Sequence, residues 1–276
     1  MLTVAQFRNL TAAVLAAERP KEDGELLPKD LMALGYSRLF SERVVDLLAE
    51  EERLKNYLFK GWQENCMPIT RVTDTYPVRL RQKLGLDSPG VVWAKGDISL
   101  LDKPAIAVVG SRELRDQNAA FAKAVGKQAA EQGFVLISGN ARGADRLAQE
   151  SCLENGGQVI SIVADSLLEQ SRQDPILYLA EDSYDLPFSA ARALSRNRLI
   201  HAMGLVTFVA QSRLEKGGTW NGSVDNLKHG YSPLCVFQDG SAAAEAFIGR
   251  GAQPVTEEAL SDLWALQEEE QKRINL

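Results

Sequence analysis

The spacing of hydrophobic residues divides the chain into a helical part and a mixed part. Up to about residue 75, apolar residues recur every three or four positions, as at Val4, Phe7, Leu10 and Val14, which is typical of amphipathic helices. Residues 41–62 continue this spacing, and no alternation typical of a strand interrupts it. The pattern therefore predicts a small helical domain over residues 1–75.

From Pro104 onward, the pattern predicts strands that alternate with helices. The predicted strands are residues 105–110, 134–139, 158–164, 205–210 and 233–237, preceded by a short one at 91–97. Most are continuous apolar runs, so we expect a parallel sheet with helices on both faces. One helix is expected over residues 117–132, with Asp116 as its N-cap and Gly133 just after its end. The fold class is α/β, an extended Rossmann-like doubly wound sheet preceded by the helical domain.

The composition of the chain indicates the cellular compartment and excludes several classes of site. The chain has 276 residues, 45% of them hydrophobic and 25% charged, as expected of a globular protein. No apolar run approaches the roughly 20 residues that cross a bilayer, and the start lacks the pattern of a signal peptide. The three cysteines have no paired spacing, and only two histidines are present. We therefore expect a cytoplasmic protein with no membrane segment, no disulfide framework and no metal site.

The charge is distributed unevenly along an acidic chain. The formal net charge is −6, which does not favour nucleic-acid binding unless a basic site forms locally. A locally basic stretch lies between Leu186 and Gly230, where six Lys and Arg residues are present and only two Asp and Glu residues. The C-terminal end is acidic instead. Candidate sites for an anion must therefore be sought at particular loops.

Two loops that leave predicted strands carry groups suited to anions. At 110–112, glycine lets the backbone approach a phosphate, serine donates a hydrogen bond, and arginine offers a planar fork. The loop at 138–145 leads to a helix N-terminus, where free N–H groups bind anions. Asp145, in the first helical turn, is interpreted as a cap or a helix-dipole contact. The predicted binding residues of these loops are Gly110, Ser111, Arg112, Ser138, Gly139 and Arg142.

Two later loops add further basic and glycine residues. Ser195 is predicted to cap a helix, which would leave three polar residues near its N-terminal end. Cations there are disfavoured unless an anion arrives, although pairing with Asp182 or Asp185 is the alternative. In the fourth loop, Trp220 either stacks on a base or packs into the core. The predicted binding residues of these loops are Arg196, Asn197, Arg198, Lys216, Gly217, Gly218 and Thr219.

The order of the motifs carries a family resemblance. The segments are YPVRL, VVWAKGDISLLDKPAIAVVGSR, ISGNARGADRLAQESCLENGGQVISIV, SRNRLIHAMGLVTFVAQS and KGGTWNGSVDNLKHG. Together they resemble the DNA-processing protein A family, also called DprA or Smf, over residues 76–240. The fourth motif departs from that family, with Gly217-Gly218-Thr219 in place of Ser-Gly-Ser or Ser-Gly-Thr. Residues 241–276 are interpreted as an acidic C-terminal extension without a winged-helix domain.

The resemblance implies a function as well as a fold. Proteins of this family bind single-stranded DNA at the sheet edge, protect it, assist loading of a RecA-type recombinase, and dimerise through the Rossmann domain. We expect the same partners here, with no cofactor and no catalytic residue. Carried over by motif, the phosphate path would comprise Gly110, Ser111, Arg112, Ser138, Gly139, Asn197 and Arg198.

Two alternative functions would place a smaller ligand at the same loops. The first is a sensor of a small nucleotide. The second is a nucleotide phosphoribohydrolase, suggested by the Gly-Gly-Thr stretch, whose counterpart motif carries a glutamate after Thr-x-x. Here no glutamate follows Thr219 at that spacing, and Asp225 is the nearest acid. Hydrolysis would require a carboxylate within hydrogen-bond reach of the sugar, so this alternative depends on Asp225.

Overall fold

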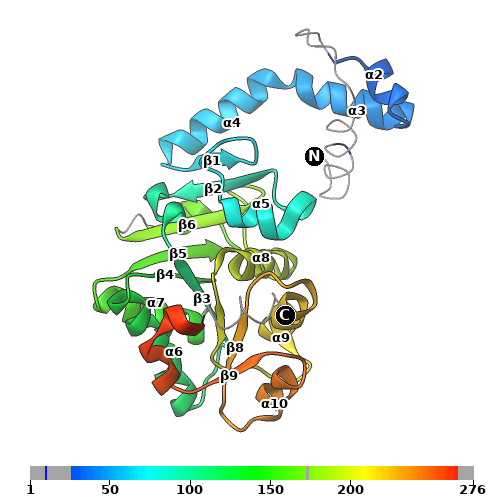
Figure 1. Ribbon diagram of the computed structural model, residues 1–276. Helices are drawn as coiled ribbons and strands as arrows, with labels where there is room; N and C mark the ends of the chain where they lie inside the picture. The colour runs from blue at the N-terminus through cyan, green and yellow to red at the C-terminus, as the bar shows by residue number, and fades with distance from the viewer. Residues whose placement is uncertain (1–9, 11–25, 172–173, 267–276) are drawn as a thin grey trace.

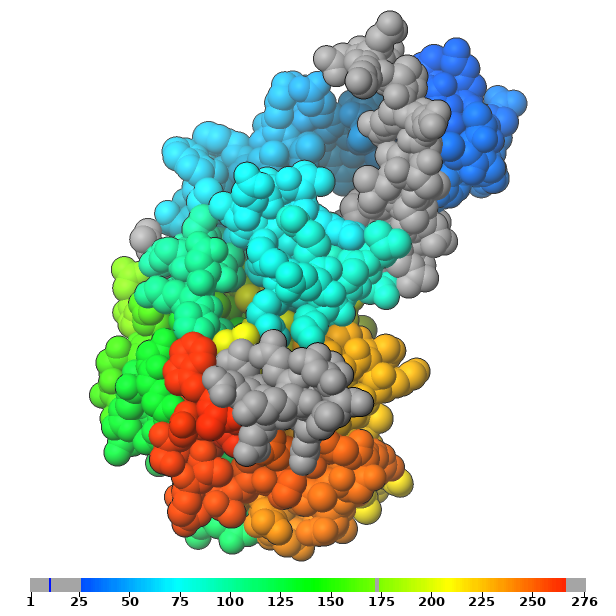
Figure 2. All heavy atoms as spheres, in the orientation of Figure 1, coloured from blue at the N-terminus to red at the C-terminus, as the bar shows by residue number. Residues whose placement is uncertain are grey.

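The computed structural model describes Leu10, residues 26–171 and residues 174–266. From residue 26 onward, the described chain forms three successive helices, α2 (Pro28–Ala33), α3 (Arg38–Ala49) and α4 (Glu51–Gln63). Ser37 caps α3 by accepting a hydrogen bond from Phe40 N at 3.3 Å. The helices α2 and α3 project from the rest of the molecule, whereas the end of α4 lies beside the sheet (Figures 1 and 2). In the part of the chain that is described, no helix is both long and apolar enough to cross a membrane.

Among the described residues, one sheet of nine strands forms the body of the molecule. Its order is β1-β2-β6-β5-β4-β3-β7-β8-β9, and every pair from β6 to β9 is parallel. The strands at one edge, β1 and β2, run antiparallel to their neighbours. The α/β fold class predicted from the sequence is therefore confirmed. The strands are β1 (Met67–Thr70), β2 (Val91–Lys95), β3 (Ala105–Val109), β4 (Val135–Ser138), β5 (Gln158–Val163), β6 (Ile176–Glu181), β7 (Thr207–Val209), β8 (Leu234–Phe237) and β9 (Gln253–Val255).

Helices cover both faces of this sheet, as its apolar strands require. One face of β3 presents Ile106 and Val108 to the core beneath α6 (Asp116–Glu131) and α7 (Ala144–Glu154). The other face presents alanines, among them Ala107, beneath α5 (Val78–Leu84), α8 (Ala190–Met203), α9 (Gly217–His229) and α10 (Ala242–Ile248). The small side chain of Ala107 matters because Gly204, at the end of α8, lies directly against it. Each helix layer therefore buries one side of the same strand.

The sheet extends beyond the 76–240 segment at both of its ends. Strand β1 lies inside the predicted helical segment 1–75, so the expectation of helix alone there is wrong. Strand β1 has only four residues, next to a turn, so its sequence shows no clear alternation of polar and apolar residues. It forms a strand because it pairs with β2 in the tertiary structure. At the other end, β9 pairs with β8, and Cys235 lies opposite Gln253. The division of the chain into three domains stays a prediction.

The topology changes direction at β3. The chain passes from β3 through β4 and β5 to β6 on one side, and then returns to place β7 on the other side of β3. In doubly wound sheets, a crevice opens outside the carboxyl ends of the strands at such a point. The loops that follow β3, β4 and β7 all leave this edge, so their residues are the candidates for a binding site.

Candidate functional site

Two adjoining cavities, of about 460 and 450 Å³, open at the carboxyl ends of β3, β4 and β7. They share Arg112, Ala141, Phe188, Ala193 and Arg196 along their common wall. We call the two cavities together the groove. Of the thirteen binding residues predicted from the sequence, those that line the groove are Gly110, Ser111, Arg112, Gly139, Arg142, Arg196, Asn197, Lys216, Gly217, Gly218 and Thr219.

The exit from β3 forms one wall of the groove and is held by backbone contacts. Ser111 N donates to Gln211 O at 2.9 Å, which ties this loop to the one after β7, and Ala144 N donates to Ser111 O at 3.2 Å. A Cβ at Gly110 would overlap that of Ala144, so glycine is required for this close approach. Arg112 is exposed and forms no salt bridge with any described residue. Its guanidinium is therefore available to an anion.

The loop after β4 is held by a buried carboxylate. Asp145 Oδ2 accepts a hydrogen bond from Gly139 N at 2.9 Å, so this side chain closes the loop as well as starting α7. Burial raises the pKa of Asp145 to about 6, although the nearby Arg196 charge and backbone N–H groups oppose the rise. Asn140, in the same loop, has a φ of 56° in the left-handed region. The loop therefore has a specific, constrained shape beneath the groove.

Arg196 is the most deeply placed cation of the groove. Its side chain is buried, its Nη1 donates to Ile162 O, and its Nε has no partner among the described residues. Burial lowers the pKa of this guanidinium, while the charges of Asp145 and Asp165 oppose that change. A buried guanidinium with an unsatisfied donor is costly on its own. An anion in the groove would offset the charge of this guanidinium.

The structure corrects the expected start of the helix that carries Arg196. Helix α8 begins at Ala190, and Ser189 caps it by accepting from Arg192 N at 3.1 Å. Ser195 is therefore within the helix and not its cap, and its Oγ donates to Glu181 Oε2 at 2.9 Å. A similar correction applies to α6, where Asp116 is the first helical residue after Arg115. The argument from cations at a helix N-terminus thus does not apply to Arg196.

Two predicted binding residues do not line the groove. Successive residues of a helix are about 100° apart, so Arg198 lies roughly 200° around α8 from Arg196. Arg198 pairs instead with the buried Glu181 of β6 and also donates to Asp87 O. Pairing with an acid was the alternative interpretation, although the expected partners were Asp182 and Asp185. Ser138 is fully buried, and its Oγ accepts from Gln149 Nε2 at 2.6 Å.

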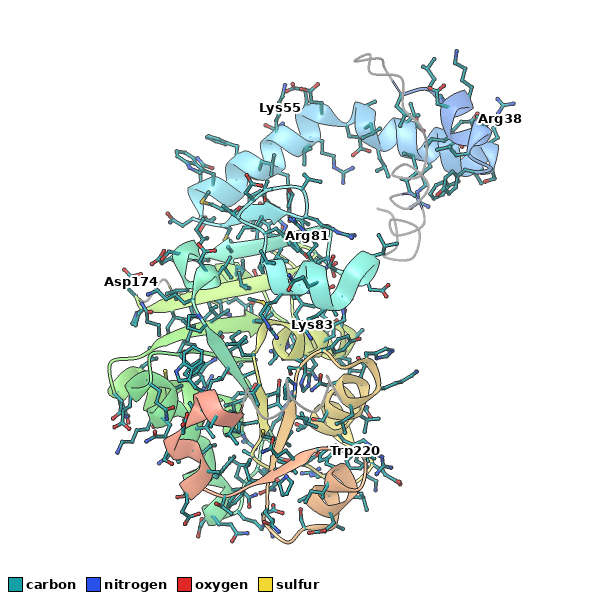
Figure 3. The ribbon with its side chains drawn as sticks, in the orientation of Figure 1. Arg38, Lys55, Arg81, Lys83, Asp174 and Trp220 are labelled. Carbon is teal, nitrogen blue, oxygen red and sulfur yellow. The ribbon has the colours of Figure 1, made fainter. Side chains whose placement is uncertain are left out.

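The fourth predicted loop brings the start of α9 to the groove. Lys216 is the N-cap residue, and no described side chain caps the helix. Its first N–H groups therefore remain open to an anion. Asn197 of α8 supports this turn, because its Nδ2 donates to Gly218 O at 3.1 Å. Trp220 lies between α9 and α10, where its ring stacks on that of Phe247 at a centroid distance of 4.6 Å, so its core interpretation is correct (Figure 3).

Arg213, His201 and Phe188 are among the groove-lining residues that the sequence did not predict. Arg213 follows β7, and its Nη2 lies 3.4 Å from Glu113 Oε2, while Arg142 Nη2 lies 3.5 Å from Glu113 Oε1. These pairs are exposed and therefore weak. His201 is buried, and burial lowers its pKa to about 3, so it stays neutral. Phe188 is 56% exposed, and a phenylalanine placed in a loop before a helix gives no signal of its position.

The charges that line the groove are mostly positive. Five basic residues line it against the two acids Asp145 and Asp165. Asp225, the acid on which the phosphoribohydrolase alternative depends, does not line it and pairs with His229 Nδ1 at 3.0 Å. Among the residues with described positions, no group of three His, Cys, Asp or Glu side chains could hold a metal ion. The basic residues are Arg112, Arg142, Arg196, Arg213 and Lys216.

Comparison with known proteins gives the chain a family. Residues 67–264 match the family described as DNA recombination-mediator protein A. The chain belongs to this family. It is 32% identical over 156 residues to the DNA processing protein DprA of Streptococcus pneumoniae, covering 52% of this chain and 54% of that protein. It is 26% identical over 213 residues to the protein Smf of Escherichia coli, covering 71% and 55% respectively. The chain thus spans about half the length of these curated relatives.

Solved structures of DprA share the fold. The X-ray structure of the Streptococcus pneumoniae protein superposes with a TM-score of 0.72 at 21% identity, covering 93% of this chain and 90% of that one. A structure of DNA processing protein A from Helicobacter pylori, described for its single-stranded DNA binding mode, superposes with a TM-score of 0.57 at 22% identity. That match covers 76% of this chain and 96% of the other. At these identities the superpositions establish a common fold with the DNA recombination-mediator protein A family.

Proposed function

We propose that this chain binds single-stranded DNA along the groove and acts without catalysis of its own. The observation that carries the proposal is the convergence of five basic side chains, from the loops after β3, β4 and β7 and from α8, on one edge of an acidic protein. A local basic groove binds a polyanion by neutralising phosphates and releasing counterions. The description of the Helicobacter pylori relative by its single-stranded DNA binding supports the same ligand class.

Phe188 gives the groove a contact for bases as well as phosphates. Its ring is 56% exposed and lines both cavities. The preceding backbone is held by Arg192, whose Nη1 donates to Leu186 O at 2.7 Å and to Pro187 O at 2.9 Å. An aromatic ring in a basic channel is the usual stacking platform for single-stranded nucleic acids. This combination favours a single strand, whose bases are accessible, over a duplex.

The decisive experiment measures binding of labelled oligothymidylates of increasing length by fluorescence anisotropy at several salt concentrations. We expect the affinity to rise with length and to fall with salt. Arg112→Met should weaken binding at every length and reduce the slope of log K against log salt by about 0.7, the value for one phosphate of a single strand. Arg53→Met is the matched control, because Arg53 is exposed on α4 and pairs with Glu50.

Two outcomes would contradict the proposal. If Arg112→Met bound DNA as tightly as the wild type, the groove would not be the DNA-binding site. An affinity that stops rising at a mononucleotide would favour the nucleotide-sensor alternative instead.

We further propose that the bound strand is protected and passed to a RecA-type recombinase, and that the protein works as a homodimer through its Rossmann domain. Membership of the DNA recombination-mediator protein A family supports this role. Recombinase loading is tested by adding the protein to a RecA-type ATPase assay on oligonucleotides coated with single-strand-binding protein. Acceleration is expected from the wild type and not from Arg112→Met. Light scattering after size exclusion tests the dimer.

A further inference from the structure

A third cavity, of about 360 Å³, lies at the C-terminal end of α8. The groove reaches along α8 as far as His201, whereas this cavity takes Met203, the last residue of the helix, and the two linings share no residue. The cavity opens at the amino end of β3, between the connection from β2 and the start of α5. Its volume is within the range of small-molecule sites. It is therefore a second candidate site, separate from the groove.

The inner wall of this cavity is apolar and reaches the core. Leu100, Ile137 and Ile160 are at most 1% exposed, and Met203 is 5% exposed, yet all four line it. The accessible aliphatic side chains of the lining, which a ligand would contact, include those of Val78, Leu101 and Leu205. The wall therefore suits an apolar body.

One guanidinium at the rim is left without a counterion. Arg79 Nη2 donates to Gly204 O at 2.7 Å, whereas its Nε is buried and has no partner among the described residues. Asp74 and Asp102 also line the cavity, but neither forms a salt bridge with Arg79. Burial lowers the pKa of this guanidinium, and no described acid opposes the change. A partly buried cation of this kind is unfavourable until an anion pairs with it.

A second cation lies close to Arg79, although the lining of the cavity itself is balanced in charge, with Asp74 and Asp102 against Arg79 and Lys103. Lys83 is one turn further along α5, on the side of the helix turned toward α8 (Figure 3). Burial lowers its pKa, and the charge of Arg79 lowers it further. Like charges four residues apart destabilise a helix. An anion beside Arg79 would relieve this repulsion.

We propose that this cavity binds a small amphipathic carboxylate, with its carboxylate paired to Arg79 and its apolar body against Val78, Leu101 and Leu205. A single planar guanidinium matches a carboxylate through two parallel hydrogen bonds. The groove, in contrast, offers several cations and an uncapped helix start, which suit phosphates. The proposal concerns a different part of the molecule and does not depend on DNA binding.

Isothermal titration of the whole chain with octanoate, octan-1-ol and octyl phosphate tests the proposal. We expect saturable binding of octanoate, and binding of octan-1-ol at least tenfold weaker. Arg79→Met should weaken octanoate binding at least tenfold and leave octan-1-ol binding unchanged. Arg81→Met is the matched control on the same helix, because Arg81 donates to Arg71 O and Thr73 O and does not line the cavity. Circular dichroism melting curves verify that each variant folds.

Three results would overturn the proposal. These are no saturable binding of octanoate to the wild type, equal binding of octanoate and octan-1-ol, or equal loss of octanoate binding in Arg79→Met and Arg81→Met. Tighter binding of octyl phosphate than of octanoate would contradict the carboxylate assignment. The wild-type comparison of octanoate with octan-1-ol decides the question even if Arg79→Met does not fold. Leu101→Trp, which places a large side chain in the cavity, should abolish binding of both ligands.

Discussion

The guanidinium of Arg196 packs directly on the backbone of Gly139, so closely that a Cβ at Gly139 would overlap it. The contact joins α8 to the loop after β4 beneath the groove. Because Asp145 accepts from Gly139 N, the same glycine backbone is fixed from the other side. Glycine is therefore needed at position 139 because it has no side chain, and the position of Arg196 depends on this.

Gly139→Ala should displace the Arg196 guanidinium and weaken single-stranded DNA binding about tenfold, since a charge-assisted contact contributes roughly 1.5–3 kcal/mol. Anisotropy with an oligothymidylate measures this. Gly249→Ala is the control, because the nearest atom to its added Cβ lies at an ordinary 3.4 Å. Wild-type affinity in a folded Gly139→Ala protein would mean that Arg196 does not contact the strand.

Glu113 pairs with two arginines that line the groove. Its carboxylate lies 3.5 Å from Arg142 Nη2 and 3.4 Å from Arg213 Nη2, and all three side chains are exposed. Glu113→Gln should therefore raise the affinity for oligothymidylate several-fold at low salt. The difference should shrink as salt screens the charges. Anisotropy at two salt concentrations measures this, with Glu131→Gln on α6 as the control; equal effects of both substitutions would contradict a local role.

The buried carboxyl of Asp145 should make stability depend on pH. Burial raises its pKa in the folded protein to about 6, above its ordinary value of 3.8. The folded state then binds the proton more tightly than the unfolded state, so stability falls as pH rises from about 4 through 6. Asp145→Asn should remove this part of the dependence. Melting temperatures of both proteins between pH 4 and 7 measure it, and parallel curves would contradict the assignment.

The sequence predicted much of the groove because its signals are local. Glycine after an apolar run, as at Gly110 and Gly139, marks a strand exit, and parallel strands bring such exits to one edge. What could not be predicted depends on helix phase and long-range pairing. Helix α8 starts at Ala190, six residues before the expected start after Ser195, so Arg196 and Arg198 lie inside the helix on different sides. Arg198 pairs with Glu181 of β6, a strand that was not among those predicted. An error of six residues in a helix start therefore hides which of two nearby arginines faces the groove.

That distinction between Arg196 and Arg198 can be tested. The side chains of Arg198 and Glu181 are 17% and 7% exposed, so Arg198→Met leaves a buried carboxylate without its partner. We expect a loss of about 3–5 kcal/mol in the free energy of unfolding. At a temperature where the variant is folded, its DNA affinity and salt slope should equal those of the wild type. Denaturant titration measures the free energy of unfolding, and anisotropy measures the DNA affinity and its salt slope. A reduced salt slope would mean that Arg198 contacts a phosphate of the strand.

Phe188 provides the test of whether the groove recognises bases. Phe188→Ala should weaken binding of oligothymidylate about 5- to 150-fold, since stacking contributes roughly 1–3 kcal/mol per base. The salt slope should not change, because no phosphate contact is lost, and Phe188→Tyr should retain most of the affinity. Phe59→Ala is the matched control, because Phe59 is 55% exposed on α4 against 56% for Phe188 and does not line the groove. An abasic oligonucleotide of the same length should bind the wild type and Phe188→Ala equally; a difference there would mean that the ring shapes the groove rather than stacking on a base.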